Sequence, residues 1–172
     1  LVAVLMIVAS VAAFAETVTD TKLGSATRFS VTVTKDATDK AAHTYGAFQV
    51  FKGDLAETKD ASENVTKKVL SNVQWGDSIE ESKIPTLRTA LNAIDGLTVA
   101  SDATADAVAK AISDAKFAND SDKAQAIADA FNAALKDTAI NTVTVAANAT
   151  SGQITNLSAG YYLIKDTADV TG

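Results

Sequence analysis

Apolar and polar residues alternate strictly in Phe29–Thr34, the first clearly patterned segment of the chain. Its phenylalanine and two valines fall on one face of an extended chain, and its serine and two threonines fall on the other. This period of two predicts a half-buried β-strand. The polar stretch Ala56–Lys68 is expected to be a loop. Segments bounded by glycine or polar residues predict further strands at about 45–51, 69–75, 141–146, 152–155 and 160–166.

The pattern changes at Pro85, and from there to about Asp137 the chain is rich in alanine, aspartate and lysine without strand-like alternation. Helices are expected at about 86–94, 104–117 and 120–136. The last is the clearest, because its apolar residues recur at the spacing of one helical face. That stripe consists of Ala124, Ile127, Ala128, Phe131 and Leu135. Asp120 or Ser121 is a candidate N-cap for this helix.

Together these elements predict a mainly β fold with an α insertion. The expected architecture is an antiparallel β-sandwich interrupted by a helical insertion at about 85–137. The helices carry few bulky residues, so we expect them to cover one edge or end of the sandwich. The predicted core combines inward strand residues with part of the helical stripe: Phe29, Val31, Val33, Phe48, Val50, Leu163, Ile127, Phe131 and Leu135.

The first residues resemble a secretory signal. Leu1–Ala13 is almost wholly apolar and leads into a small-x-small pattern that ends at Ala15, before the first charge at Glu16. The run is too short for a bilayer span of about 20 residues. We therefore expect residues 1–15 to be a signal peptide, truncated at its start because it has neither an initiator methionine nor a basic segment. Residues 16–172 have the size of one domain, which we expect to be incomplete at its C-terminus.

Cleavage is expected between Ala15 and Glu16. Signal peptidases select small side chains at the positions before the cut, and Ala13 and Ala15 supply them. N-terminal sequencing of the secreted full-length protein should therefore begin at Glu16. A mature protein that kept the apolar segment would contradict this prediction.

Composition narrows the class of function. The net charge of −6 argues against binding to nucleic acid or to anionic membrane surfaces, because both bind proteins through clusters of lysine and arginine. The chain has no cysteine, so disulfides do not stabilise it. With one histidine and scattered carboxylates, neither a transition-metal site nor a cofactor is expected.

The aromatic residues allow two interpretations. They could form a sugar-binding platform, but their strand-like spacing is more typical of core and sheet-face positions. The residues concerned are Tyr45, Phe48, Phe51, Trp75, Tyr161 and Tyr162. His43 has no serine, cysteine or aspartate partner in a recognisable catalytic arrangement, so we interpret it as structural or exposed. Without a nucleophile and base in such an arrangement, an enzyme is not expected.

Three stretches carry a family resemblance when they are taken in order. They are His43–Leu55, Val69–Gly76 and Ala159–Asp166, with the patterns HTYxAxQxFxGDL, VLSNxxWG and GYYLxKD. This ordered set resembles the N-terminal domain of the major backbone pilins of Gram-positive bacteria. Those pilins are fimbrial subunits that sortase enzymes polymerise into covalent fibres, and they belong to the isopeptide-forming fimbrial proteins.

The resemblance implies an immunoglobulin-like or Cna B-like sandwich in residues 16–172, with a mechanical role. The protein would be a secreted subunit of a cell-surface pilus, joined head to tail to other subunits by sortase and linked to the cell wall. Its partners would be other subunits, sortase and a host surface, and it would meet the membrane only through a sorting signal absent from this sequence. The alternative is a secreted adhesin domain that binds a host protein or glycan.

The resemblance also points to Lys35 and Asp166 as a possible isopeptide site. Related pilin domains join a lysine on the first strand to an asparagine on the last, assisted by a buried acid. Burial favours the neutral amine as nucleophile, and the protonated acid polarises the carboxamide. Lys35 directly follows the first predicted strand, and Asp166 stands where the family has its acid.

This sequence departs from the family pattern in two ways. The acid is Asp166 rather than glutamate, and no asparagine-bearing final strand follows it within the sequence. First domains of these pilins also frequently lack the bond, so the alternative reading of Lys35 is an ordinary turn lysine. The lysine motif that joins subunits and the sorting signal would both lie beyond residue 172.

Overall fold

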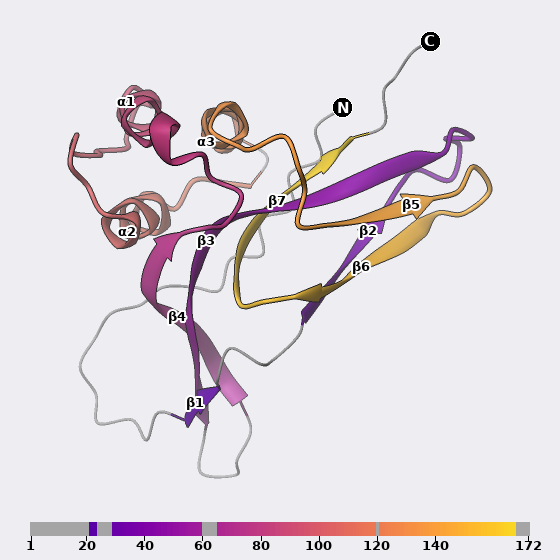
Figure 1. Cartoon of the computed structure of the whole chain (residues 1–172), viewed down its shortest axis with the longest axis horizontal. Coiled ribbons are helices and arrows are strands. Elements are labelled where there is room, and N and C mark those ends of the chain that lie inside the picture. The colour runs from indigo at the N-terminus through magenta and orange to yellow at the C-terminus, as the bar shows by residue number, and fades with distance from the viewer. Residues whose placement is uncertain (1–20, 24–28, 60–64, 120, 168–172) are drawn as a thin grey trace.

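The computed structural model describes residues 21–23, 29–59, 65–119 and 121–167. The predicted signal peptide and its cleavage site lie outside these residues, as does Asp120. Within them the chain is mainly β, with antiparallel sheets and a few helices, an arrangement compatible with a β-sandwich (Figure 1).

One long strand, β3 (His43–Lys59), is central to the larger sheet. The first part of β3 pairs with β5 (Asn141–Val145) and β7 (Gly160–Asp166), and the later part pairs with β4 (Val65–Trp75) and β1 (Thr21–Leu23). All four pairings are antiparallel. The strand therefore holds together segments from both ends of the described chain.

A second, two-stranded sheet lies beside the larger one. It consists of β2 (Phe29–Thr34) and β6 (Ser151–Leu157), paired antiparallel with Val31 opposite Ile154. On the inward face of β2, Val31 and Val33 are buried and Phe29 is half-buried, while its serine and threonines are exposed, as the alternating pattern predicts. The predicted strand at 152–155 thus belongs to β6, which is longer than expected.

The helical layer begins with the short 3-10 helix η1 (Glu81–Lys83), followed by α1 (Ile84–Asn92), α2 (Ala105–Ala115) and α3 (Asp122–Ala133). Two of the helices have side-chain N-caps. Ser121 Oγ accepts a hydrogen bond from Ala124 N at 3.1 Å, and Thr104 Oγ1 accepts one from Ala107 N at 3.2 Å. Each cap satisfies a backbone N–H that has no partner within its helix.

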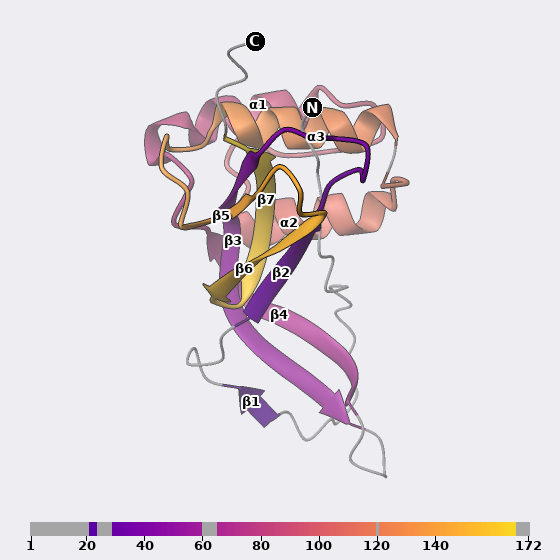
Figure 2. The same ribbon diagram turned by 90° about the vertical axis from the view of Figure 1, so that its right-hand side faces the viewer.

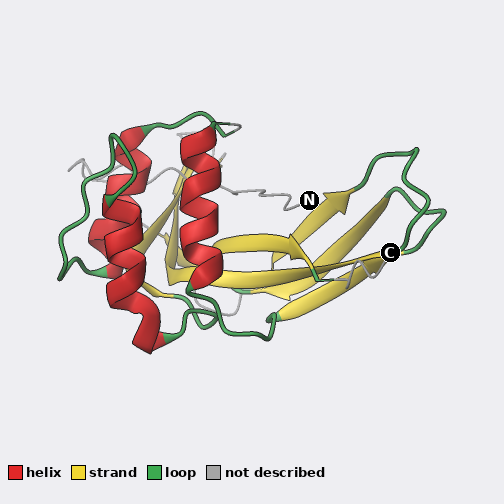
Figure 3. Ribbon diagram, turned by 90° about the horizontal axis from the view of Figure 1, so that it is seen from above, coloured by secondary structure: helices red, strands yellow, loops and turns green. Residues whose placement is uncertain are grey.

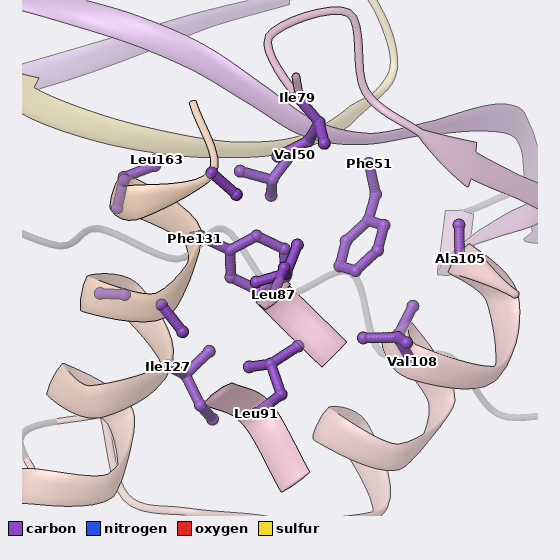
Figure 4. Close-up of a cluster of buried hydrophobic side chains, with 14 of the residues drawn as sticks. Val50, Phe51, Ile79, Leu87, Leu91, Ala105, Val108, Ile127, Phe131 and Leu163 are labelled. Atoms are coloured by element: carbon purple, nitrogen blue, oxygen red, sulfur yellow. The ribbon is translucent and has the colours of Figure 1, made fainter. Parts of the chain in front are cut away.

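These helices run across the direction of the strands (Figure 3). They cover a face of the larger sheet, whereas the sequence led us to expect cover at an edge or end. The contacts that establish this are apolar: Phe131 of α3, Leu87 of α1 and Val108 of α2 share one cluster with Phe48 and Val50 of β3. Figure 4 shows Phe131 in the middle of this cluster.

The larger sheet is buried on both faces over the first part of β3. One face packs against the two-stranded sheet through Tyr45 and Ala47, and the other packs against the helices through Phe48 and Val50. This explains why the segment from Tyr45 to Phe51 has an almost continuous apolar sequence and is buried throughout. The predicted core is confirmed, except that Phe29 is only half-buried.

The expected loop over Ala56–Lys68 is largely strand, and this expectation was wrong. β3 continues to Lys59 and β4 already begins at Val65. The two strands form an arm, accompanied by β1, that extends away from the helices and the two-stranded sheet (Figure 2). Backbone pairing within the arm provides its hydrogen bonds, and this pairing leaves no periodic apolar pattern in the sequence.

Within the described ranges, no helix combines the length and the apolar character that crossing a membrane requires.

Candidate functional site

The most concentrated group of ionisable side chains lies where β7 ends beside the start of β3. Strand register places Tyr45 opposite Asp166, and Thr167 N then donates to Thr44 O at 2.6 Å. The loop between β2 and β3 closes over the same place and brings Asp39 to it. His43, the first residue of β3, lies between the two aspartates.

His43 contacts a carboxylate on each side of its ring. Nδ1 is hydrogen-bonded to Asp166 Oδ2. Nε2 lies 2.8 Å from Asp39 Oδ2, which makes an ion pair but not a well-aligned hydrogen bond. The side chains of His43 and Asp166 are 20% and 15% exposed, so the contact on the Nδ1 side is the better shielded from water.

This environment shifts the pKa values of His43 and of its neighbours Asp39 and Tyr45. The pKa of His43 is raised, chiefly by the hydrogen bond to Asp166, against the opposing effect of burial and with help from the charge of Asp39. The pKa of Asp39 is lowered, first by the hydrogen bond from Ala41 N at 2.9 Å. Tyr45 stacks on the histidine ring at 6.0 Å between centroids, and burial raises the pKa of its hydroxyl.

Lys35, at the other side of the same loop, is bound by backbone carbonyl groups. Its Nζ donates to Asp39 O at 3.0 Å, to Ala147 O at 3.1 Å and to Ala41 O. Three acceptors match the three N–H donors of an ammonium group. The lysine thereby fastens the loop and the turn after β5 to the end of β2.

The two residues of the possible isopeptide site thus lie near one another without a direct bond. Lys35 binds the carbonyl of Asp39, the Asp39 side chain meets His43, and His43 meets Asp166. For Lys35 to attack a carboxamide, its nitrogen would first have to leave the three carbonyls. The isopeptide bond stays a prediction.

A second polar group is buried in the middle of the sheet. Gln49 of β3 is 1% exposed, and its Nε2 donates to Ser158 Oγ at 3.0 Å and to Tyr162 Oη at 3.1 Å. Its backbone N–H donates to Ser78 Oγ at 2.9 Å. These hydrogen bonds satisfy the buried amide within the protein, so they give the group a structural role.

The aromatic residues lie mainly in the core. Tyr45, Phe48, Phe51 and Tyr162 are buried, and Trp75 and Tyr161 are half-buried. Phe51 stacks on Trp75 at 5.5 Å between centroids and meets Tyr161 edge to face at 6.1 Å. The core interpretation of these side chains is confirmed.

Sequence reasoning missed the pairing of His43 with two aspartates. Asp39 lies four residues before the histidine, but Asp166 reaches it only through the register of β3 with β7. The one sign of this pairing in the sequence was the position of Asp39, four residues before His43.

In the part of the chain that the structure describes, no group of three or more histidine or carboxylate side chains is placed to hold a metal ion.

Comparison with models of protein families, with curated proteins and with solved structures finds no match to this chain. Its function has to be inferred from its own residues and their arrangement.

Proposed function

We propose that this chain is the N-terminal domain of a structural subunit of a cell-surface pilus, exported, polymerised by sortase and linked to the cell wall. One observation carries the proposal. The three stretches that resemble backbone pilins meet at Gln49 and Val50 of β3.

Each stretch contributes to that meeting point. Gln49 comes from the first stretch and Tyr162 from the third, and the two are hydrogen-bonded. Gly76 ends the second stretch, and its N–H donates to Val50 O at 2.9 Å. These motif residues hold the fold together and do not line a reactive group. Such a role suits a protein whose function is mechanical.

The long central strand supports a load-bearing role. At about 3.3 Å per residue, the 17 residues of β3 span about 56 Å. This one strand runs from the helix-covered body into the projecting arm and pairs along its length with four other strands. A continuous antiparallel ladder of this kind gives a rigid link between the two parts.

The finer fold assignment belongs to the same proposal. We infer an immunoglobulin-like or Cna B-like sandwich from the two antiparallel sheets that enclose Val31, Tyr45 and Ile154. The helical layer over the other face of the larger sheet is an addition to the plain sandwich.

The adhesin alternative would draw support from an exposed aromatic surface. Among the described residues, the large hydrophobic side chain that is exposed is Ile140, at 39%. A single exposed isoleucine is ordinary for a protein surface and does not indicate a ligand site. The structural subunit therefore remains the better supported function.

The proposal is tested by the molecular size of the protein species on the cell surface. In cells that carry the gene, antibodies to this domain should stain a ladder of SDS-resistant species in wall extracts, because sortase joins subunits covalently. Deletion of the sortase gene should collapse the ladder to a monomer. The matched control is a strain that expresses Ile140→Ala, which alters an exposed side chain and should leave the ladder intact. A monomer of the same size with and without sortase would overturn the proposal.

A further inference from the structure

We propose that His43 is a proton-operated latch, which holds the end of β7 and the β2–β3 loop against the start of β3 when protonated and releases them when neutral. The proposal does not depend on the pilus function. It rests on the position of one imidazole ring between two carboxylates from different segments.

The geometry favours a charged ring. Nδ1 is hydrogen-bonded to the carboxylate of Asp166, and Nε2 lies 2.8 Å from that of Asp39, so each ring nitrogen has an anionic group beside it. Only imidazolium has a proton on both nitrogens. In the neutral ring one nitrogen carries a lone pair, which would repel the carboxylate that it faces.

The latch joins three segments of the chain at one point. Asp39 lies in the loop, His43 begins β3, and Asp166 ends β7. Beyond Asp166, Thr167 bonds to Thr44 O through its N–H at 2.6 Å and through Oγ1 at 3.0 Å. These bonds depend on the end of β7 staying against β3, so loss of the Asp166 contact exposes them to water.

The other charged and ionisable groups around the ring come from the loop, from β3 and from β7. On the loop side, Lys35 is bound to three carbonyls and attracts Asp39. On β3, the raised pKa of Tyr45 keeps its hydroxyl neutral across the range in question. On β7, Asp166 is the direct partner of the ring. The chain has no second histidine.

The sign of the pH dependence follows from these directions. His43 has a folded-state pKa raised above its ordinary value of 6.5, so its stabilising contribution is present in full below pH 6.5 and is lost as pH rises through the raised value. Asp39 has a pKa lowered below 3.8, so its contribution is present above pH 3.8 and is lost as pH falls through the lowered value. The latch is therefore closed below pH 6.5 and opens as the pH rises through the raised pKa of His43.

Two measurements test the latch on the chain as it is. Because there is one histidine, its ring signals in an NMR titration are unambiguous, and we expect a midpoint above pH 6.5. In parallel, the melting temperature of the wild type should fall between pH 6.5 and about pH 9, and that of His43→Gln should stay nearly level over the same interval. Other groups that titrate there are common to both proteins and cancel in the comparison.

Asparagine variants of the two aspartates distinguish a latch from a histidine that is merely buried. Asp166→Asn should lower the midpoint of the histidine titration by more than Asp39→Asn does, because the hydrogen bond to Asp166 is the largest cause of the raised pKa. A wild-type midpoint at or below pH 6.5 would overturn the proposal even if His43→Gln failed to fold. So would parallel melting profiles for the wild type and His43→Gln.

Discussion

Truncation of Phe131 to alanine is expected to reduce the free energy of unfolding by about 3–5 kcal/mol. Phe131 is 1% exposed and lies between the helices and the larger sheet, where it meets Phe51 edge to face at 5.4 Å between centroids. Leu87 of α1 and Leu163 of β7 belong to the same cluster (Figure 4). The cavity left by the ring would be lined by groups from several elements, which cannot all collapse into it.

Urea unfolding followed by circular dichroism measures this effect. Small domains have a total stability of about 5–15 kcal/mol, so the loss should shift the midpoint strongly or leave the protein unfolded. Ile140→Ala is the matched control, because that side chain is 39% exposed and its truncation should change stability by less than about 1 kcal/mol. Equal losses in the two variants would mean that the helices do not pack on the sheet as described.

Replacing Gly76 with alanine is expected to destabilise the domain by about 3 kcal/mol or more. A Cβ at this position would lie 2.1 Å from Gln49 O and 2.8 Å from Val50 C. Both are backbone atoms of the central strand and cannot swing aside as a flexible side chain can. The turn after β4 would have to move, which breaks the bond from Gly76 N to Val50 O and the contact of Ser78 with Gln49.

The Gly96→Ala variant measures the cost of replacing a glycine at a position where the added Cβ causes no clash. Gly96 has a φ of +84°, yet a Cβ there would meet nothing closer than 3.4 Å. Its replacement should cost only about 1–2 kcal/mol, the price of a left-handed conformation for a residue with a side chain. Thermal or urea unfolding of both variants gives the comparison. A loss for Gly76→Ala no larger than that for Gly96→Ala would show that the turn can move freely away from β3.

Local patterns predicted the elements whose stability comes from burial or capping. The alternation in Phe29–Thr34 gave the bounds of β2, because one face of that strand packs on the core and the other meets water. The apolar stripe of α3 and its N-cap at Ser121 could also be predicted from the sequence, because both depend on residues only a few positions apart.

The sequence did not reveal features that depend on distant segments. The outer part of the arm, within Ala56–Lys68, was taken for a loop, because the strands there pair with each other and carry no periodic apolar signal. The site around His43 was missed because Asp166 comes to it from the far end of the described chain, through strand register. In Tyr45–Phe51 the side with Phe48 and Val50 was predicted to be buried, but burial of the opposite side depends on the distant two-stranded sheet.

The pairing scheme also determines when folding can be completed. β2 near the start of the described chain pairs with β6, and the first part of β3 pairs with β5 and β7 near its end. Partners so distant in sequence make a domain of high contact order, which folds slowly because long loops must close before the contacts form. A chain that emerged from a ribosome or a translocation channel with its N-terminus first would complete the two-stranded sheet only after Leu157 had followed, and the larger sheet only after Asp166. Such a chain could close around β3 only after its last strands had been released.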